Sequence, residues 1–107
     1  MTPTEKDDPI LIRVRTALEQ MYGDRLERVV LYGSRARGDA REDSDYDIAV
    51  FLRGTPDLAA EMNRLGTLSS EILFDAIELV HAMPWPAGAW SDRTPIMHEI
   101  RQDGVDL

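Results

Sequence analysis

Apolar residues recur along this chain with two different periods, and the change between them predicts the order of helices and strands. Spacing of three and four residues predicts three amphipathic helices, over 9–22, 57–74 and 95–103. Short runs rich in valine, isoleucine and leucine predict three strands, at 26–32, 45–52 and 76–82. The resulting order of helix, strand, strand, helix, strand, helix is typical of a mixed α/β sheet.

Glycine and proline mark where these elements are interrupted. Gly33-Ser34 ends the first strand, and Ser34 could cap a short helical turn over 35–38. The Pro-Trp-Pro-Ala-Gly sequence at 84–88 predicts a loop after the third strand. Gly66 lies inside the second long helix, where glycine costs about 1 kcal/mol relative to alanine. We therefore expect a kink or a break at that position.

The connections between the strands indicate how the sheet is built. The short segment between the first two strands allows antiparallel pairing, whereas the helix before the third strand allows a crossover. We expect an α/β (α+β) fold, with a small mixed sheet and helices packed against one face. A length of 107 residues fits a single domain spanning 1–107. The polar residues 1–8 are expected to form a flexible end.

Composition and charge narrow the possible classes of function. Cysteine is absent, which excludes disulfide frameworks and thiolate zinc sites. A formal net charge of −8 disfavours a groove for long DNA or RNA. No apolar run is long enough for a membrane span or a signal peptide, so we expect a cytoplasmic protein without membrane contact. The basic cluster of Arg35, Arg37 and Arg41 suits a small anion better than a polymer.

The stretch that joins the first two strands combines groups for an anion with groups for a cation. Gly33-Ser34 offers backbone N–H groups at a turn, a common phosphate-binding arrangement. Asp45 and Asp47 begin the second strand, where residues two apart share a face, about 7 Å from each other. Two carboxylates on one face repel each other unless a cation lies between them. Magnesium-bound triphosphate requires both kinds of group.

These motifs resemble a known family. Gly-Ser-Arg-Ala-Arg-Gly at 33–38 and Ser-Asp-Tyr-Asp-Ile-Ala-Val at 44–50 are similar to the minimal nucleotidyltransferase (MNT) domains of the DNA polymerase β superfamily. In that superfamily a Gly-Ser turn is followed, about ten residues later, by Asp-x-Asp on the next strand. The closing Ile-x-x-x-Gly-Val pattern at 100–105 extends the resemblance loosely over the chain.

The resemblance implies a fold, a reaction and a partner. It implies the nucleotidyltransferase fold, with Gly33 and Ser34 holding the β- and γ-phosphates of ATP, and Asp45 and Asp47 binding Mg²⁺, as two ions. Such domains often act as antitoxins for a HEPN-type toxin, and some transfer AMP from ATP to a tyrosine of that toxin. Arg35 and Arg37 follow this turn directly in the sequence and are candidate nucleotide contacts.

The family pattern also calls for a third carboxylate, on a later strand, as catalytic group and metal ligand. Glu78 is the favoured candidate because it lies between apolar residues in the expected strand, and Asp75 is the alternative. Being three residues apart, the two would lie on opposite faces of a strand, so at most one of them can reach Asp45 and Asp47. His81 has no partner at metal-ligand spacing and is interpreted as an ordinary strand residue.

Two other functions compete with a protein adenylyltransferase antitoxin. The chain could neutralise its toxin by binding alone, with weak catalysis, which the absence of a clear third carboxylate favours. It could also modify a small molecule, although 107 residues leave no second domain to hold one. The acceptor, the preferred base and the oligomeric state stay open at this point.

Overall fold

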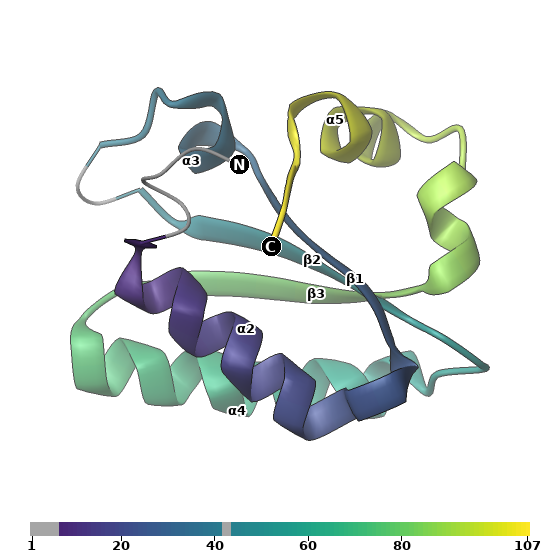
Figure 1. Ribbon diagram of the computed structural model, residues 1–107, viewed down its shortest axis with the longest axis horizontal. Helices are drawn as coiled ribbons and strands as arrows, with labels where there is room; N and C mark the ends of the chain where they lie inside the picture. Colours follow the sequence, from purple (N-terminus) through teal and green to yellow (C-terminus); the bar gives the residue numbers. More distant parts are fainter. Residues whose placement is uncertain (1–6, 42–43) are drawn as a thin grey trace.

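A four-stranded mixed β-sheet forms the centre of the molecule. The computed structural model describes residues 7–41 and 44–107, so the expected flexible end at 1–8 lies mostly outside the described residues. The strand order is β3-β2-β1-β4 (Figure 1). The helices are α2 Pro9–Tyr22, η1 Gly23–Arg25, α3 Ser34–Arg37, α4 Leu58–Ala76, η2 Ala87–Ser91 and α5 Pro95–Asp103. The strands are β1 Leu26–Tyr32, β2 Tyr46–Leu52, β3 Val80–Pro86 and β4 Val105–Asp106.

Strand pairing follows the connections between the strands. β1 and β2 are antiparallel, as the short segment between them predicts. β2 and β3 are parallel and are joined by α4, which confirms the predicted crossover. β4 adds an antiparallel strand on the other side of β1. The sheet is therefore mixed, in agreement with the expected fold class.

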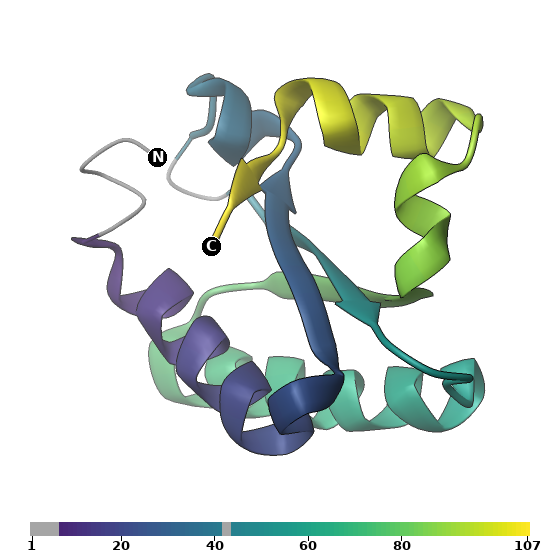
Figure 2. The ribbon, with the colours of Figure 1, turned by 45° about the vertical axis from the view of Figure 1, so that its right-hand side comes forward.

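Helices cover both faces of this sheet (Figure 2). The two long helices α2 and α4 pack on one face, as expected, where Ile48 and Val50 of β2 are fully buried. The other face of the same strand presents Ala49 and Phe51, which are buried as well. This second face packs under η2 and α5, so the expectation of helices on one face alone is incomplete. A strand that is apolar on both faces needs cover on both sides.

The third strand starts later than the sequence predicts. Helix α4 continues to Ala76 and ends with Ile77 in the left-handed region, at φ 57°. The apolar residues Ile77 and Leu79, which suggested a strand over 76–82, are 84% and 47% exposed. Pro84 and Pro86 lie in the strand and not in a loop. Both fit because β3 is the last strand on one side of the sheet among the described residues, and proline is tolerated in such an edge strand.

Gly66 does not interrupt α4, which is continuous over its 19 residues. We expect Gly66→Ala to raise the free energy of unfolding by about 0.5–1 kcal/mol, because alanine loses less backbone entropy on folding into a helix. The residue is exposed, and an added Cβ meets no atom within 4 Å. A higher midpoint of chemical denaturation checks this, and a lower midpoint would show that the helix needs glycine there.

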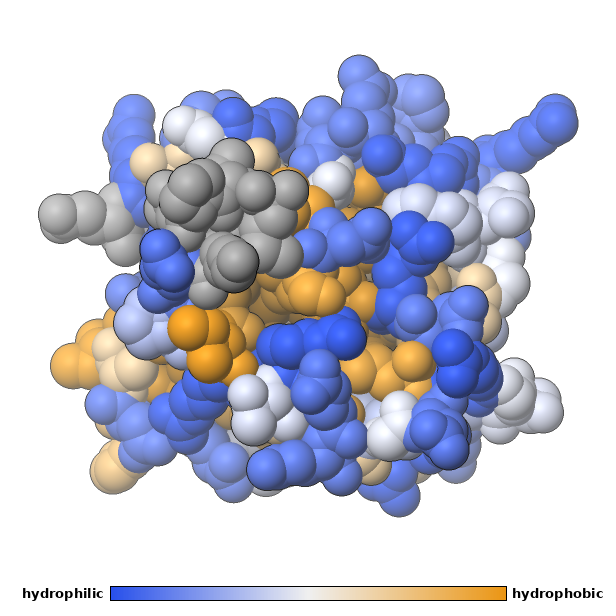
Figure 3. All heavy atoms as spheres, viewed as in Figure 1, coloured by the Kyte–Doolittle hydropathy of each residue, from blue (hydrophilic) through white to orange (hydrophobic). Residues whose placement is uncertain are grey.

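The surface is mainly hydrophilic on the side of the molecule shown in Figure 3. Apolar groups gather across the middle of that view, where β1 and β4 lie in Figure 1.

Among residues 7–41 and 44–107, no helix combines the length and the apolar character that crossing a membrane requires.

Candidate active site

The turn at Gly33 connects β1 to the single-turn helix α3. Gly33 has φ 75° and ψ −156°, a conformation that is essentially restricted to glycine. Its carbonyl accepts a hydrogen bond from the Arg37 N–H at 3.1 Å, and the Ser34 carbonyl accepts one from the Asp39 N–H at 3.1 Å. The expected helical turn over 35–38 is thus present, starting one residue earlier, with Gly33 and not Ser34 as its N-cap.

Strand pairing places Asp47 against this turn. Asp47 lies opposite Tyr32, the last residue of β1, in the antiparallel register of β1 and β2. A Cβ added to Gly33 would lie 2.5 Å from Oδ2 of Asp47. The carboxylate therefore occupies the space that any other side chain at position 33 would need. This contact joins the turn that is predicted to bind an anion to Asp47, one of the two predicted metal ligands.

The environment of Asp47 favours a cation. Burial raises the pKa of the Asp47 carboxyl, and the charges of Asp45 and Glu99 raise it further, whereas His81 and Arg37 lower it. Burial, together with Asp47 and Glu99, also raises the pKa of Tyr32. An ionised carboxylate that is partly desolvated beside two others gains when a cation lies among them.

Asp45 lies just before β2, which starts one residue later than the sequence predicts, and its side chain is exposed. Among residues 7–41 and 44–107, no group of three histidine, aspartate or glutamate side chains stands ready to hold a metal ion. Magnesium in phosphate-transfer sites, however, is commonly held by one or two carboxylates and completed by substrate phosphates and water. The donor set of Asp45 and Asp47, beside a turn that is predicted to bind phosphate, fits that kind of site.

The two candidate arginines lie on opposite sides of the sheet. Arg35 donates from Nε to the Ser44 carbonyl at 2.9 Å and stacks over the Tyr46 ring at 3.9 Å. Tyr46 belongs to the core under α2 and α4, so Arg35 is turned away from Asp47. Arg37 is on the Asp47 side, where its Nη1 approaches Glu99 of α5 at 3.6 Å. Of the two expected nucleotide contacts, Arg37 is the one whose charge lowers the pKa of Asp47, whereas Arg35 contacts the backbone next to Asp45.

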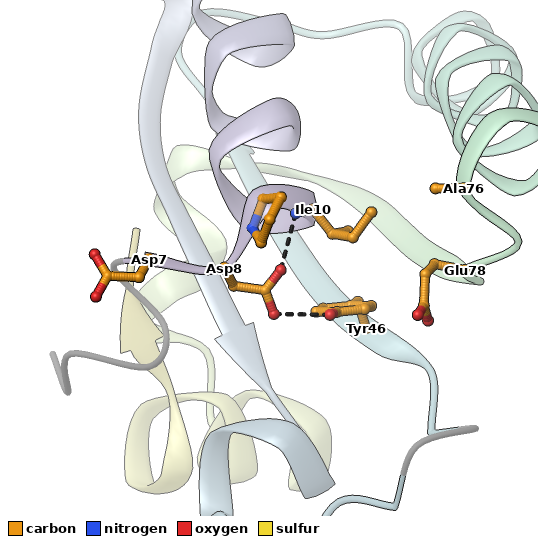
Figure 4. Close-up of a pocket in the computed structure, with 7 residues that line it drawn as sticks. Asp7, Asp8, Ile10, Tyr46, Ala76 and Glu78 are labelled. Carbon is orange, nitrogen blue, oxygen red and sulfur yellow. Dashed lines mark hydrogen bonds between the residues drawn. The ribbon is translucent and has the colours of Figure 1, made fainter.

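The structure does not bring Glu78 to the metal site. Glu78 precedes β3 and faces Arg35, whose Nη2 is 3.8 Å from Glu78 Oε2. It lines a pocket of about 520 Å³ together with Asp8, Ile10 and Tyr46 (Figure 4). The hydroxyl of Tyr46 donates to Asp8 Oδ2 at 2.7 Å in this pocket. The structure therefore places Glu78 beside Arg35 and not beside Asp47, because β3 begins two residues after it.

Asp75, the alternative third ligand, does not lie beside Asp47 either. It lies in the last turn of α4 and not on a strand. Its carboxylate forms an ion pair with Arg13 of α2 at 2.8 Å, and its side chain is 57% exposed. Asp75 therefore links the two long helices, on the face of the sheet opposite Asp47.

His81 and Glu99 are the neighbours of Asp47 that sequence reasoning missed. His81 is paired with Asp47 in the parallel register of β2 and β3, and its Nδ1 lies 3.8 Å from Asp47 Oδ1. Glu99 comes from α5, which covers this face. A third strand starting at Val80 would have indicated His81, because residues paired between neighbouring strands share a face. No local pattern in the sequence indicates Glu99, which depends on the packing of α5.

Comparison with known proteins gives three results. Residues 17–105 match the family described as Polymerase beta, Nucleotidyltransferase. A Methanocaldococcus jannaschii protein named "Putative protein adenylyltransferase MJ0141" is 49% identical over 49 residues, which cover 46% of this chain and 50% of that protein. The chain thus spans about half the length of this curated relative. A crystal structure of a mutant of the toxin–antitoxin MntA-HpeT shares the fold, with a TM-score of 0.60 and 19% identity over 87% of this chain and 68% of that chain.

Proposed function

Because the chain belongs to the polymerase beta nucleotidyltransferase family, we propose that it transfers AMP from ATP to a tyrosine hydroxyl of a partner protein. The proposed partner is a HEPN-type toxin, and the chain would be the MNT antitoxin that inactivates it. Similarity to a relative named as a protein adenylyltransferase supports the reaction. The choice of partner draws on the MNT-like motifs and on the toxin–antitoxin complex that shares this fold.

The contact between Asp47 and the Gly33 turn is the observation that supports this proposal, because it places a turn suited to phosphate next to a ligand suited to a cation. Gly33 and Ser34 are proposed to hold the β- and γ-phosphates through the turn. Asp45 and Asp47 would hold Mg²⁺, proposed as two ions, which when bound offsets negative charge on the phosphates. Arg37 is the arginine proposed to contact the nucleotide, since Arg35 is turned to the other face.

In the proposed reaction the oxygen of the acceptor hydroxyl attacks the α-phosphorus of ATP in line with the leaving group. A new P–O bond forms to the acceptor while the bond between the α-phosphorus and the bridging oxygen breaks. Pyrophosphate leaves with that oxygen, and the hydroxyl proton passes to solvent. The chain contributes by positioning the triphosphate and its counterion, which is the main source of catalysis in such transfers.

Incubation of the chain with α-labelled ATP, Mg²⁺ and the protein encoded by the neighbouring gene tests the proposal. We expect label on the partner and, by peptide mass spectrometry, AMP on a tyrosine. A variant with Asp45→Asn and Asp47→Asn is the matched control and should leave the partner unlabelled. Absence of label with the wild-type chain at saturating ATP would contradict the transferase function.

One observation favours a second function, in which the chain neutralises its toxin by binding alone. Neither Glu78 nor Asp75, the two predicted third carboxylates, lies beside Asp47, because they pair with Arg35 and Arg13 on the other side of the sheet. The same double variant distinguishes the two functions in cells that express the toxin. If transfer inactivates the toxin, the variant should fail to restore growth, whereas full restoration of growth would support binding alone.

A further inference from the structure

We propose that His81 is a metal ligand of this site and makes the site bind Mn²⁺ more tightly than Mg²⁺. The proposal deepens the function proposed above, on which it rests for the need of a divalent cation. It adds an imidazole ligand beside Asp47, where the sequence pattern pointed to the carboxylate of Glu78, and it leaves other ligand positions to phosphate oxygens and water. The same position thereby becomes a determinant of which metal ion the chain uses.

Strand register brings His81 to the correct face. His81 is the direct parallel partner of Asp47 on the neighbouring strand. Residues alternate along β3, so His81 shares its face with Trp85, which packs into the core under α5. Val80 belongs to the opposite core, under α2 and α4. His81 and Asp47 therefore project side by side from the α5 face of the sheet.

The distance between the two donor atoms suits a shared metal ion. Nδ1 of His81 lies 3.8 Å from Oδ1 of Asp47, which is too long for a hydrogen bond. With octahedral ligand distances of about 2.1 Å, two donor atoms are about 3.0 Å apart when adjacent and about 4.2 Å apart when opposite. The observed separation exceeds that of adjacent ligands by about 0.8 Å, a gap that a small rotation of the exposed His81 side chain can close. The His81 side chain is 64% exposed, which leaves room for an ion, water and phosphate oxygens.

The chemistry of the donors determines the preference. Imidazole is a poor ligand for Mg²⁺, which prefers oxygen, whereas first-row transition ions accept nitrogen and oxygen together. An aspartate at position 81 would provide a third carboxylate and an oxygen-only site. Histidine instead lowers the negative charge of the site and adds a nitrogen donor. Compared with an aspartate at position 81, both changes weaken the binding of Mg²⁺ more than the binding of Mn²⁺.

Manganese binding to the isolated chain tests this assignment without ATP or a partner. Titration followed by the electron paramagnetic resonance signal of free Mn²⁺ gives the affinity, and competition with Mg²⁺ gives the selectivity. We expect His81→Ala to weaken Mn²⁺ binding about tenfold or more and to change Mg²⁺ binding by less than about twofold. His81→Asp should tighten Mg²⁺ binding and reduce the preference for Mn²⁺.

The chain contains two histidines, so His98→Ala is a matched control. His98 lies on α5 and is exposed, and this variant should bind Mn²⁺ as the wild type does. Pulsed electron paramagnetic resonance should detect a nitrogen coupled to bound Mn²⁺ in the wild type and in His98→Ala, but not in His81→Ala. No Mn²⁺ binding at millimolar concentration, or equal affinity and nitrogen coupling without His81, would overturn the proposal.

The outcome of the Mn²⁺ binding experiments can be distinguished from the outcome of the transfer assay. Nitrogen-coupled Mn²⁺ without labelling of the partner would support the ligand assignment and reject the transferase. Labelling of the partner with Mg²⁺, at the same rate in the wild type and in His81→Ala, with no nitrogen coupling, would support the transferase and reject the assignment.

Discussion

Replacement of Asp47 by asparagine is expected to lower the rate of AMP transfer by about a thousandfold or more, since one charged metal ligand is lost. The fold should be retained. Because burial and neighbouring carboxylates raise its pKa, the folded chain holds the Asp47 proton more tightly than the unfolded chain does. The ionised carboxylate thus costs stability at neutral pH, and removing its charge should leave the melting temperature unchanged or higher.

Two matched variants make this prediction specific to the site. Asp75→Asn and Glu78→Gln remove the same charge from residues that pair with Arg13 and Arg35 on the other side of the sheet. Both should transfer AMP within about threefold of the wild-type rate, because neither carboxylate lies beside Asp47. Initial rates of partner labelling at saturating ATP provide the measurement. A loss in Glu78→Gln as large as in Asp47→Asn would show that Glu78 reaches the reacting groups.

Gly33→Ala is expected to lower both stability and transfer. The backbone conformation of Gly33, at φ 75° and ψ −156°, costs a residue with a side chain about 1–3 kcal/mol. The added methyl group would also lie 2.5 Å from Oδ2 of Asp47, so the carboxylate has to move. Because a misplacement of about 1 Å can reduce a rate about a hundredfold, we expect a loss of that order. Thermal unfolding and partner labelling measure the two effects separately.

Gly38→Ala is the control for backbone strain alone. Gly38 ends α3 with φ 81° in the left-handed region, and an added Cβ there meets nothing within 4 Å. This variant should lose about 1 kcal/mol of stability and keep its transfer rate. If Gly38→Ala loses transfer as strongly as Gly33→Ala does, strain in the turn, and not the contact with Asp47, would be the cause.

The sequence predicts most elements well where the pattern is local. The helix at 9–22 begins at a proline and ends at a glycine, and its bounds agree with α2. The strand at 26–32 agrees with β1, because a β-branched run flanked by polar residues is a strong signal. The prediction is wrong at 76–82, where the apolar residues Ile77 and Leu79 give a pattern that resembles a strand. Apolar content alone does not reveal whether a residue is buried, and both are exposed.

The sequence predicts that the two motifs lie close together, because both parts belong to one short connection between strands. Gly33-Ser34 and Asp45-x-Asp47 flank the same loop, so their spacing in sequence limits their separation in space. The sequence does not predict in this way which face of the sheet Arg35 and Arg37 are directed to. They are two residues apart on a single helical turn, and only packing against Tyr46 and α5 directs them to opposite faces of the sheet.

The sequence by itself therefore determined the nucleotidyltransferase-like motif, the order of the elements and the two carboxylates Asp45 and Asp47. Only the tertiary structure decided which groups surround them. The register of β3 against β2 brings His81, and not Glu78, beside Asp47, and the packing of α5 brings Glu99. Register is a cooperative property of two strands, and a shift by one residue moves every side chain to the other face. No residue in the third strand carries that information on its own.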